Sequence, residues 1–320
     1  ILLSGTTSVT AFASLAIYDA QTLSLTADIA GSFTLEVLKG TLMAMDERLM
    51  AVRPHPDQIN TAANIRAILK DSPMLERCRG HRVQDALSIR CMPQLHGPVK
   101  KAVKDAQATL AIELNSSVDN PLIFDEEDGG AVALMGCNAD GTYAGMASDN
   151  LCIAITDLCK MSNSRIDRLL NSLVSELPAF LNKNADFNNG LMMIQYASAG
   201  LQGELHILAH PAVVDNLTTC ANQEDYVNMG YNAAKKAYDS MHLAKYILAA
   251  ELICDGQALD CYEDKRCAKG TQAIYDLLRS KVPEMDNDMP LTPYLEAVAQ
   301  QIIDRAYIRT VEASVGALKF

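Results

Sequence analysis

Apolar residues recur at helical spacing over long stretches of this chain. Between residues 143 and 171 one continuous stripe runs through Leu151, Ile155, Leu158, Ser162, Ile166 and Leu169. A spacing of three and four residues places side chains on one face of an α-helix. Residues 230–257 repeat the pattern, and residues 188–209 show it with only glycines as interruptions. Helices of this length are typical of extended bundles, so the sequence predicts an all-α, long-helix bundle.

Strand signals are confined to one short region. The apolar runs Leu122-Ile123-Phe124 and Ala131-Val132-Ala133-Leu134 predict a small β-hairpin. Its acidic turn is interpreted as solvated rather than as a calcium loop, because the alternating ligand spacing of such a loop is missing. A final helix is predicted to open at Thr292-Pro293, a cap followed by proline in the first turn, and then to bury Leu295, Val298, Ile302 and Ala306. No linker and no internal repeat interrupts the chain, so we expect a single all-α domain over residues 1–320.

Charge and cysteine content exclude several classes of protein. The formal net charge of -12 leaves no basic stripe for nucleic acid. No apolar run reaches the roughly 18 residues of a membrane span, and no signal peptide is visible, so we expect a soluble, cytoplasmic protein. The nine cysteines form no C-x-x-C pair and are interpreted as reduced thiols, with no disulfide frame and no metal site.

Residues 82–94 are a dense polar segment between Ala/Leu-rich stretches. Two arginines, two glutamines and an aspartate lie within it. An unpaired polar group near a core costs roughly 1–3 kcal/mol, so the segment is either an internal hydrogen-bond network or a ligand site. An arginine there offers a fixed fork of donors that fits a carboxylate.

Three further polar segments interrupt the helical pattern, at residues 113–121, 135–141 and 222–230. Each one alone favours a structural interpretation, because asparagine, aspartate, serine, glycine and proline are the residues of caps and turns. A helix N-terminus after residue 141 also favours an anion, but the glycine spacing of a phosphate loop is missing. The four segments together form a far less ordinary set.

In order, the segments resemble those of the aromatic amino-acid ammonia-lyases and aminomutases, most closely the histidine ammonia-lyase type. The family pattern reads Leu-Leu-Asn-Gly-Thr, Arg-Val-Gln-Asp-Pro-Tyr-Ser-Leu-Arg-Cys-Gln-Pro-Gln, Asn-Ser-x-x-Asp-Asn-Pro, Gly-Gly-Asn-Phe-His-Gly, Asn-Ser-Gly-Phe-Met and Asn-Gln-Glu-Asp-His-Val-Ser-Met. The corresponding residues here are 2–6, 82–94, 115–121, 136–141, 188–192 and 222–229. The match extends from Leu2 to about residue 260, and more weakly to the end. The resemblance implies the long-helix fold shared by ammonia-lyases and fumarase.

The resemblance also implies a protein-derived electrophile, methylidene-imidazolone, which forms from an internal Ala-Ser-Gly. These 320 residues contain no such tripeptide, and they begin in mid-pattern at Ile1. In the family the tripeptide and the tyrosine base lie before the point where this chain starts. We therefore expect an N-terminal partner chain, or an absent N-terminal part, to carry Ala-Ser-Gly, in a hetero-oligomer with a tetrameric core. His206 and His210 lie four residues apart, a spacing that can present two metal ligands on one helix face, but the His-Pro at 210–211 belongs to the family pattern without a metal role.

Family roles transfer to the residues that match. Arg90 corresponds to the arginine that clamps the substrate carboxylate, and Gln84 to a glutamine that orients substrate and prosthetic group. Glu224 corresponds to the acidic residue near the amine and side-chain end of the pocket. Asn138 corresponds to an asparagine that fixes the backbone beside the substrate.

Four departures bear on the substrate. Ser4 replaces an asparagine that contacts the electrophile, Leu87 replaces a tyrosine, and Ala139 with Asp140 replace a Phe-His pair. Two aromatic surfaces are lost, so an ordinary aromatic substrate would fit loosely. The added carboxylate of Asp140 either holds a cationic group of the substrate or caps the following helix.

These features support three hypotheses. The first is a catalytic subunit of a two-chain ammonia-lyase for a small α-amino acid, with histidine or another cationic substrate favoured and an aminomutase as a variant. The second is a non-catalytic structural or regulatory subunit, which the losses at Ser4 and Leu87 favour and the retained Gln84, Arg90 and Glu224 oppose. The third is a fragment of one intact polypeptide.

Overall fold

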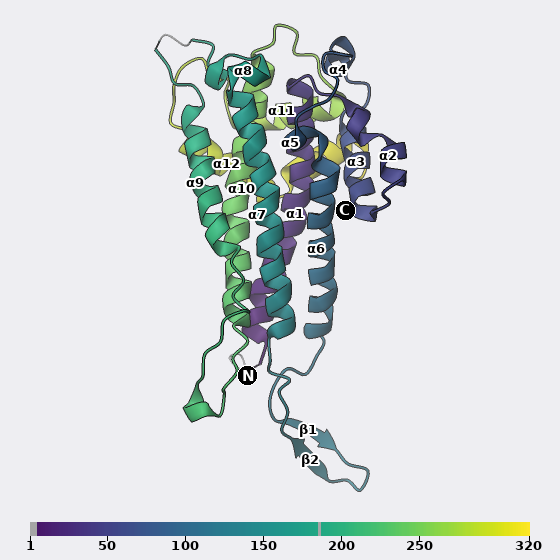
Figure 1. The fold of residues 1–320 in the computed structure, drawn as a ribbon, viewed down its shortest axis with the longest axis vertical. Helices are drawn as coiled ribbons and strands as arrows, with labels where there is room; N and C mark the ends of the chain where they lie inside the picture. Colours follow the sequence, from purple (N-terminus) through teal and green to yellow (C-terminus); the bar gives the residue numbers. More distant parts are fainter. Residues whose placement is uncertain (1–4, 185–186) are drawn as a thin grey trace.

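Long, nearly parallel and antiparallel helices dominate the fold. The computed structural model describes residues 5–184 and 187–320. Five long helices form an elongated bundle, with bounds α1 (Thr7–Val37), α6 (Met92–Glu113), α7 (Thr142–Leu170), α9 (Met192–Leu208) and α10 (Gly230–Asp260) (Figure 1). The predicted all-α bundle is confirmed, and α7 and α10 coincide with the two longest apolar patterns.

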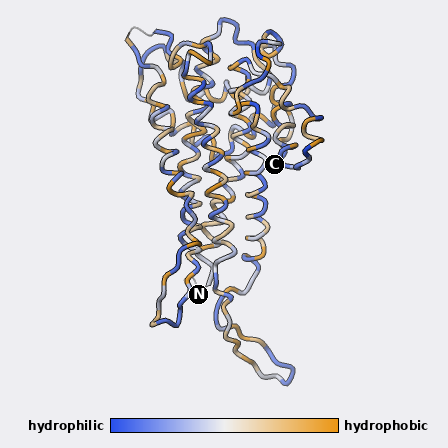
Figure 2. The backbone as a smooth tube through the Cα atoms, viewed as in Figure 1, coloured by the Kyte–Doolittle hydropathy of each residue, from blue (hydrophilic) through white to orange (hydrophobic). Residues whose placement is uncertain are grey.

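The small β-hairpin is also confirmed. Strands β1 (Leu122–Asp125) and β2 (Ala131–Leu134) pair antiparallel, with Leu122 opposite Leu134. The hairpin projects from one end of the bundle, and its tip is hydrophilic (Figures 1 and 2). Gly129 takes a φ of 83° in the turn, a conformation that glycine adopts without a steric penalty.

Shorter helices cluster mainly at the opposite end and along one side of the bundle. They are η1 (Leu42–Met45), α2 (Glu47–Ala51), α3 (Pro56–Ile68), α4 (Pro73–Arg77), α5 (Leu87–Arg90), α8 (Ser172–Ser175), η2 (Ala179–Leu181) and α11 (Lys269–Arg279). The turn η3 (Cys220–Asn222) lies in the long loop before α10. We call residues 38–43, 69–91, 171–184 and 187–191 the α5 end, and residues 5–6, 114–141 and 209–229 the hairpin end (Figure 1).

The last predicted helix is two helices in the structure. Helix α12 (Thr292–Ile303) begins at Thr292 as predicted, but its N-cap is Leu291, so Thr292 does not cap it; α13 (Ala306–Val315) follows after a break. The break falls at Arg305, which adopts a left-handed φ of 58° that an α-helix does not accommodate. The prediction that one helix buries Ala306 together with Val298 and Ile302 was therefore wrong.

Helix α1 is the central helix of the bundle. From Thr22 to Val37 every side chain is buried, because α1 packs against α6, α7 and α10. One contiguous hydrophobic cluster reaches from Val9 to Val311. The single-domain organisation of residues 1–320 nevertheless remains a prediction.

Charged side chains lie inside this core in two clusters. In the first, Asp28 of α1 accepts from Lys100 Nζ at 2.5 Å and pairs with His96 Nδ1 at 2.8 Å, and all three side chains are fully buried. In the second, Arg165 of α7 pairs with Glu251 of α10, also without exposure. Buried ion pairs need further hydrogen bonds to offset the loss of water, and both clusters contain them.

Two further observations bear on the sequence predictions. In the part of the chain that the structure describes, no helix is both long and apolar enough to cross a lipid bilayer. None of the nine cysteines, all of which lie among the described residues, is in a disulfide.

Candidate functional site

The segment that carries Gln84, Leu87 and Arg90 lies at the α5 end. Gln84 is exposed, Leu87 is 61% exposed, and Arg90 is partly buried at the last position of α5. Among the described residues, the buried Nε of Arg90 has no hydrogen-bond partner. Guanidinium donors left without a partner away from water are unusual in folded proteins, and they mark a place where a ligand is to be expected.

Contacts on both sides fix this segment to the bundle. Asp85 Oδ2 accepts from the backbone N–H of Thr41 at 2.7 Å, and Arg82 donates to the Leu38 carbonyl at 2.5 Å. Both partners lie just after α1. The carbonyl of Ser88 accepts from the buried Arg165 at 3.3 Å. The short helix α5 is therefore held by its neighbours, since four residues are too few to form a stable helix alone.

Paired charges surround the segment. Glu176 contacts Lys39 at 3.0 Å, His81 at 2.8 Å and Arg82 at 3.3 Å. The hydrogen bond from Lys39, together with that from His81, lowers the pKa of Glu176 to about 2. Burial raises the pKa of Asp85, although the Thr41 N–H and nearby arginines oppose the shift.

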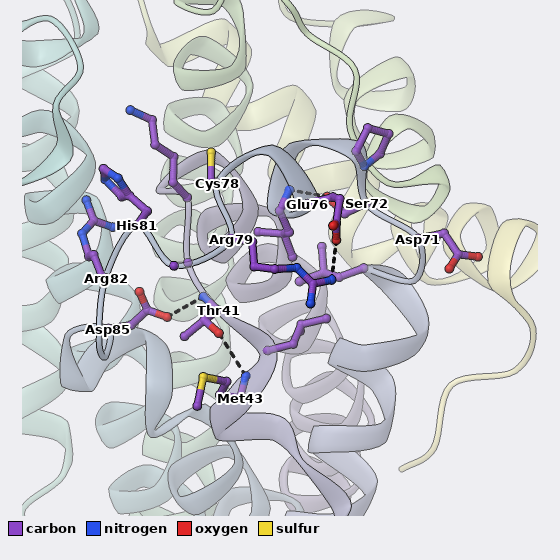
Figure 3. Close-up of a pocket in the computed structure, with 17 residues that line it drawn as sticks. Thr41, Met43, Asp71, Ser72, Glu76, Cys78, Arg79, His81, Arg82 and Asp85 are labelled. Carbon is purple, nitrogen blue, oxygen red and sulfur yellow. Dashed lines mark hydrogen bonds and ion pairs between the residues drawn. The ribbon is translucent and has the colours of Figure 1, made fainter.

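A cavity of about 710 Å³ lies beside the segment (Figure 3). Its wall includes Arg82 and Asp85 together with Lys39, Thr41 and Arg79. Gln84, Leu87 and Arg90 do not line it. The three predicted site residues therefore lie outside this cavity, and Gln84 and Leu87 are open to solvent.

The remaining predicted residues lie at the hairpin end. Asn138 is exposed, and its amide lies 3.4 Å from the Ser117 carbonyl. Ala139 is partly buried before α7. Glu224 is exposed, and its Oε2 accepts from Thr219 Oγ1 at 2.7 Å.

Both carboxylate oxygens of Asp140 have partners. Oδ1 accepts from the backbone N–H of Thr142 at 2.9 Å, in the first turn of α7. Oδ2 accepts from Asn228 Nδ2 at 3.0 Å. Of the two interpretations of Asp140, this geometry favours the helix cap, and it also connects the loops before α7 and α10.

The first sequence motif packs against the third at the hairpin end. Ser4 lies outside the described residues, but its neighbour Gly5 adopts a φ of 68°. A Cβ on Gly5 would lie 1.7 Å from the Val118 carbonyl oxygen, so only glycine fits. The backbone after Ser4 is therefore tightly packed against residues 115–121.

One chain does not bring the predicted site residues together. Ser88, two residues before Arg90, contacts Arg165 on α7, whereas Asp140 contacts Thr142 at the start of the same helix. With a rise of about 1.5 Å per residue, these contacts lie roughly 35 Å apart along α7. Gln84, Leu87 and Arg90 form one group at the α5 end, and Asn138, Ala139, Asp140 and Glu224 form another at the hairpin end (Figure 1).

Sequence reasoning missed Arg165, although a signal was present. Arg165 lies three residues after Ser162 and one before Ile166, inside the apolar stripe of α7. An arginine at such a position needs a buried partner. His206 and His210 do not share a helix face, because α9 ends at Leu208. Among the described residues, no three His, Cys, Asp or Glu side chains gather as metal ligands do.

Comparison with known proteins identifies the family. The model of the family described as aromatic amino acid lyase matches residues 1–280. This chain belongs to the aromatic amino acid lyase family. The resemblance seen in the motifs is thereby confirmed.

Curated relatives of this family member are named as histidine ammonia-lyases. Histidine ammonia-lyase 2 of Fusobacterium nucleatum is 40% identical over 319 residues, which are 99% of this chain and 62% of that protein. Histidine ammonia-lyase of Symbiobacterium thermophilum is 39% identical, again over 99% of this chain and 62% of its own length. The chain thus spans less than two thirds of these relatives.

Solved structures of the family share the fold. The crystal structure of histidine ammonia-lyase from Trypanosoma cruzi has a TM-score of 0.89 and 33% identity, covering 98% of this chain and 59% of that one. Tyrosine aminomutase from Streptomyces globisporus has a TM-score of 0.92 and 27% identity, covering 99% of this chain and 64% of that one. Both a lyase and an aminomutase therefore share this helical arrangement.

Proposed function

We propose that this chain forms part of the active site of an amino-acid ammonia-lyase, with Arg90 as the clamp for the substrate carboxylate. The observation that carries the proposal is the buried Nε of Arg90, which has no partner among the described residues, in the same segment as the exposed Gln84. The α-carboxylate of an amino acid is the acceptor that would complete this set of donors. The named relatives, all histidine ammonia-lyases, support the same chemistry.

The chemistry of the clamp follows from the guanidinium group. It is planar, permanently charged and offers parallel N–H donors, so it binds a carboxylate through two hydrogen bonds. A lysine in its place would keep the charge but lose the fork. Gln84 offers an amide donor and acceptor nearby, suited to orienting the substrate and the prosthetic group.

The complete site is proposed to need more than one chain. Arg90 and Glu224 lie at opposite ends of the bundle, so neither reaches the other within one copy. Exposed apolar residues at both ends, Val83 and Leu87 at one and Ile123 and Phe124 at the other, suit burial against partners. We propose a hetero-oligomer with a tetrameric core, in which the α5 end of one copy meets the hairpin end of another.

The electrophile is proposed to come from a partner chain that carries Ala-Ser-Gly, or from a part of the protein outside these 320 residues, which do not contain that tripeptide. The exposed amide of Gln84 fits a role in holding such a group by hydrogen bonds. When bound, methylidene-imidazolone would convert the substrate amine into a leaving group. The residues of this chain would bind the carboxylate, orient the side chain and exclude water.

Substrate choice is assigned to the hairpin end. Glu224 places an exposed carboxylate there, and Ala139 leaves space where the family has an aromatic ring. The negative charge of Glu224 favours an amino acid with a cationic or imidazole side chain. Asp140 is expected to contribute less than Glu224 to recognition of the substrate side chain, because both of its carboxylate oxygens already have partners.

An aminomutase is the second candidate function, and the likeness to tyrosine aminomutase of Streptomyces globisporus favours it. The two reactions differ in product, since a lyase releases ammonia and an α,β-unsaturated acid, whereas an aminomutase yields a β-amino acid. A non-catalytic subunit is the third, favoured by the exposed Leu87 where the family has a tyrosine. A cytoplasmic location also remains a proposal.

The deciding experiment measures turnover of histidine and phenylalanine by the complete assembly with Arg90→Lys and Arg90→Ala. Loss of two charge-assisted hydrogen bonds of about 1.5–3 kcal/mol each predicts a fall in kcat/KM of at least about a hundredfold for Arg90→Ala. Arg48→Lys, at a side chain that is 90% exposed and remote from α5, is the control. Unchanged turnover in Arg90→Ala would show that the chain is not catalytic, and a β-amino acid product would show an aminomutase.

A further inference from the structure

The buried cluster around Arg165 lies directly beneath the segment that carries Arg90. Arg165 Nε and Nη2 donate to the two carboxylate oxygens of Glu251, the second bond at 3.0 Å. Ser162 Oγ and Thr34 Oγ1 also donate to Glu251. The remaining guanidinium nitrogen, Nη1, leaves the cluster and donates to the Ser88 carbonyl at 3.3 Å.

A second buried carboxyl group adjoins the cluster. Thr34 Oγ1 lies 2.9 Å from Glu251 Oε1 and 2.7 Å from Asp255 Oδ1, and a hydroxyl has only one proton to donate. Burial, together with the neighbouring Glu251, raises the pKa of Asp255 well above its ordinary value and so disfavours its charged form. Arg165 is therefore paired with Glu251 rather than shared between two carboxylates.

The hydrogen bond from Arg165 to the Ser88 carbonyl matters because few other contacts fix α5 to the bundle. It comprises four residues, of which only Ile89 is buried. Just after it, Met92 packs on α1 at Gly31, where a Cβ would lie 2.3 Å from the Met92 sulfur. These apolar contacts set how deep the segment lies, but they are non-directional. The bond from Arg165 to Ser88 is directional and acts on the backbone two residues before Arg90.

We propose that Arg165 is a positioning residue for Arg90. By holding the Ser88 carbonyl from the core, it sets the orientation of α5 in which the Arg90 guanidinium meets the substrate carboxylate. This inference rests on the proposed function, because it takes Arg90 as the clamp. Positions of binding groups matter on the scale of one ångström, so a loosened α5 weakens substrate binding even when Arg90 itself is intact.

The test uses Arg165→Lys in the complete assembly. Lysine keeps a positive charge opposite Glu251 but cannot also reach Ser88 with a second nitrogen of the same fork. We expect the KM for the amino acid to rise about fivefold to tenfold, as for the loss of one hydrogen bond. In an Arg90→Ala background the same substitution should raise KM by less than about twofold, because residues that act together are not additive.

The matched control is Lys100→Met, which breaks the other fully buried ion pair, to Asp28. It should lower the unfolding midpoint at least as much as Arg165→Lys while leaving KM within about twofold. The inference is overturned if Lys100→Met raises KM as much as Arg165→Lys does. The inference is also overturned if Arg90→Lys raises KM and Arg165→Lys does not, although the proposed role of Arg90 would then still stand. An unchanged KM in Arg90→Lys overturns both the inference and the proposed function.

Discussion

Asn228 donates its side-chain amide to Asp140 Oδ2 at 3.0 Å, joining the loop before α10 to the loop before α7. Thr142 Oγ1 and Tyr226 Oη, 3.3 Å apart, make a second connection between the same loops. Two segments that are far apart in the sequence thereby form one rigid support at the hairpin end. Glu224, four residues before Asn228, is presented from this support.

The geometry predicts that Asp140 acts mainly as a helix cap. Asp140→Ala should lower the free energy of unfolding by about 1 kcal/mol, because the Thr142 N–H loses its acceptor. Asp140→Asn keeps an acceptor oxygen and should cost clearly less. Chemical denaturation of both variants measures the difference. If both substitutions instead reduce the preference for histidine over phenylalanine equally, the charge of Asp140 contacts the substrate.

Restoring an aromatic ring at Leu87 should improve binding of aromatic amino acids. Leu87→Tyr supplies surface that the family pattern has and this chain lacks, and such rings contribute about 0.5–1.5 kcal/mol beyond area burial. We expect KM for phenylalanine to fall about threefold to tenfold. Val83→Tyr, at a 95% exposed position on the same segment, is the control. An equal gain from Val83→Tyr would show that the ring acts through general surface hydrophobicity.

His96 should make the protein less stable in mild acid. Burial lowers the pKa of His96, although its hydrogen bond to Asp28 opposes the shift. The unfolded chain takes up a proton below about pH 6.5 while the folded state does not, so this contribution to stability is present above that pH and is lost as pH falls. Below that pH the free energy of unfolding should fall by up to about 1.4 kcal/mol per pH unit through His96.

The measurement compares denaturant unfolding of the wild type and His96→Gln at pH 7.5 and 5.5. The wild type should lose more stability on acidification than the variant, because glutamine does not titrate. His55→Gln, at an exposed histidine, should follow the wild type. Identical pH dependence in the wild type and His96→Gln would rule out this role.

Gly5 and Gly200 should respond to alanine with opposite signs. Gly5→Ala forces a side chain into a left-handed φ and against Val118, so it should destabilise the chain by more than about 1 kcal/mol. Gly200 lies within α9, with no other atom near its Cβ position. Gly200→Ala should therefore raise stability by up to about 1 kcal/mol, through helix propensity. Equal changes in the unfolding midpoint would contradict the packing at Gly5.

Much of the fold was predictable because it follows from periodicity. The stripe from residue 143 to 171 specifies α7 to within one residue at each end, and the short apolar runs at 122–124 and 131–134 specify the hairpin. Thr292-Pro293 also marks the start of α12. Such signals are local, so one sequence is enough to show them.

The arrangement of the site was not predictable by the same means. The motifs name Arg90 and Glu224 as neighbours in function, but nothing in their spacing shows that α7 separates them by its length. The burial of Asp28 was equally hidden, because a charged residue on a helix is ordinarily on its solvated face. Only the packing of α1 between three other helices shows that this position has no solvated face.

The length of α7 also bears on how the substrate specificity of such a protein can evolve. Under the proposed roles, Arg90 binds the carboxylate that all α-amino acids share, and Glu224 faces the side chain that differs between them. Within one copy these two residues lie at opposite ends of the bundle, so a substitution near Glu224 acts on Arg90 of the same copy only through the length of α7. Substrate specificity can therefore change through substitutions at the hairpin end while the α5 end of the same copy, and with it the carboxylate-binding role proposed for Arg90, stays unchanged.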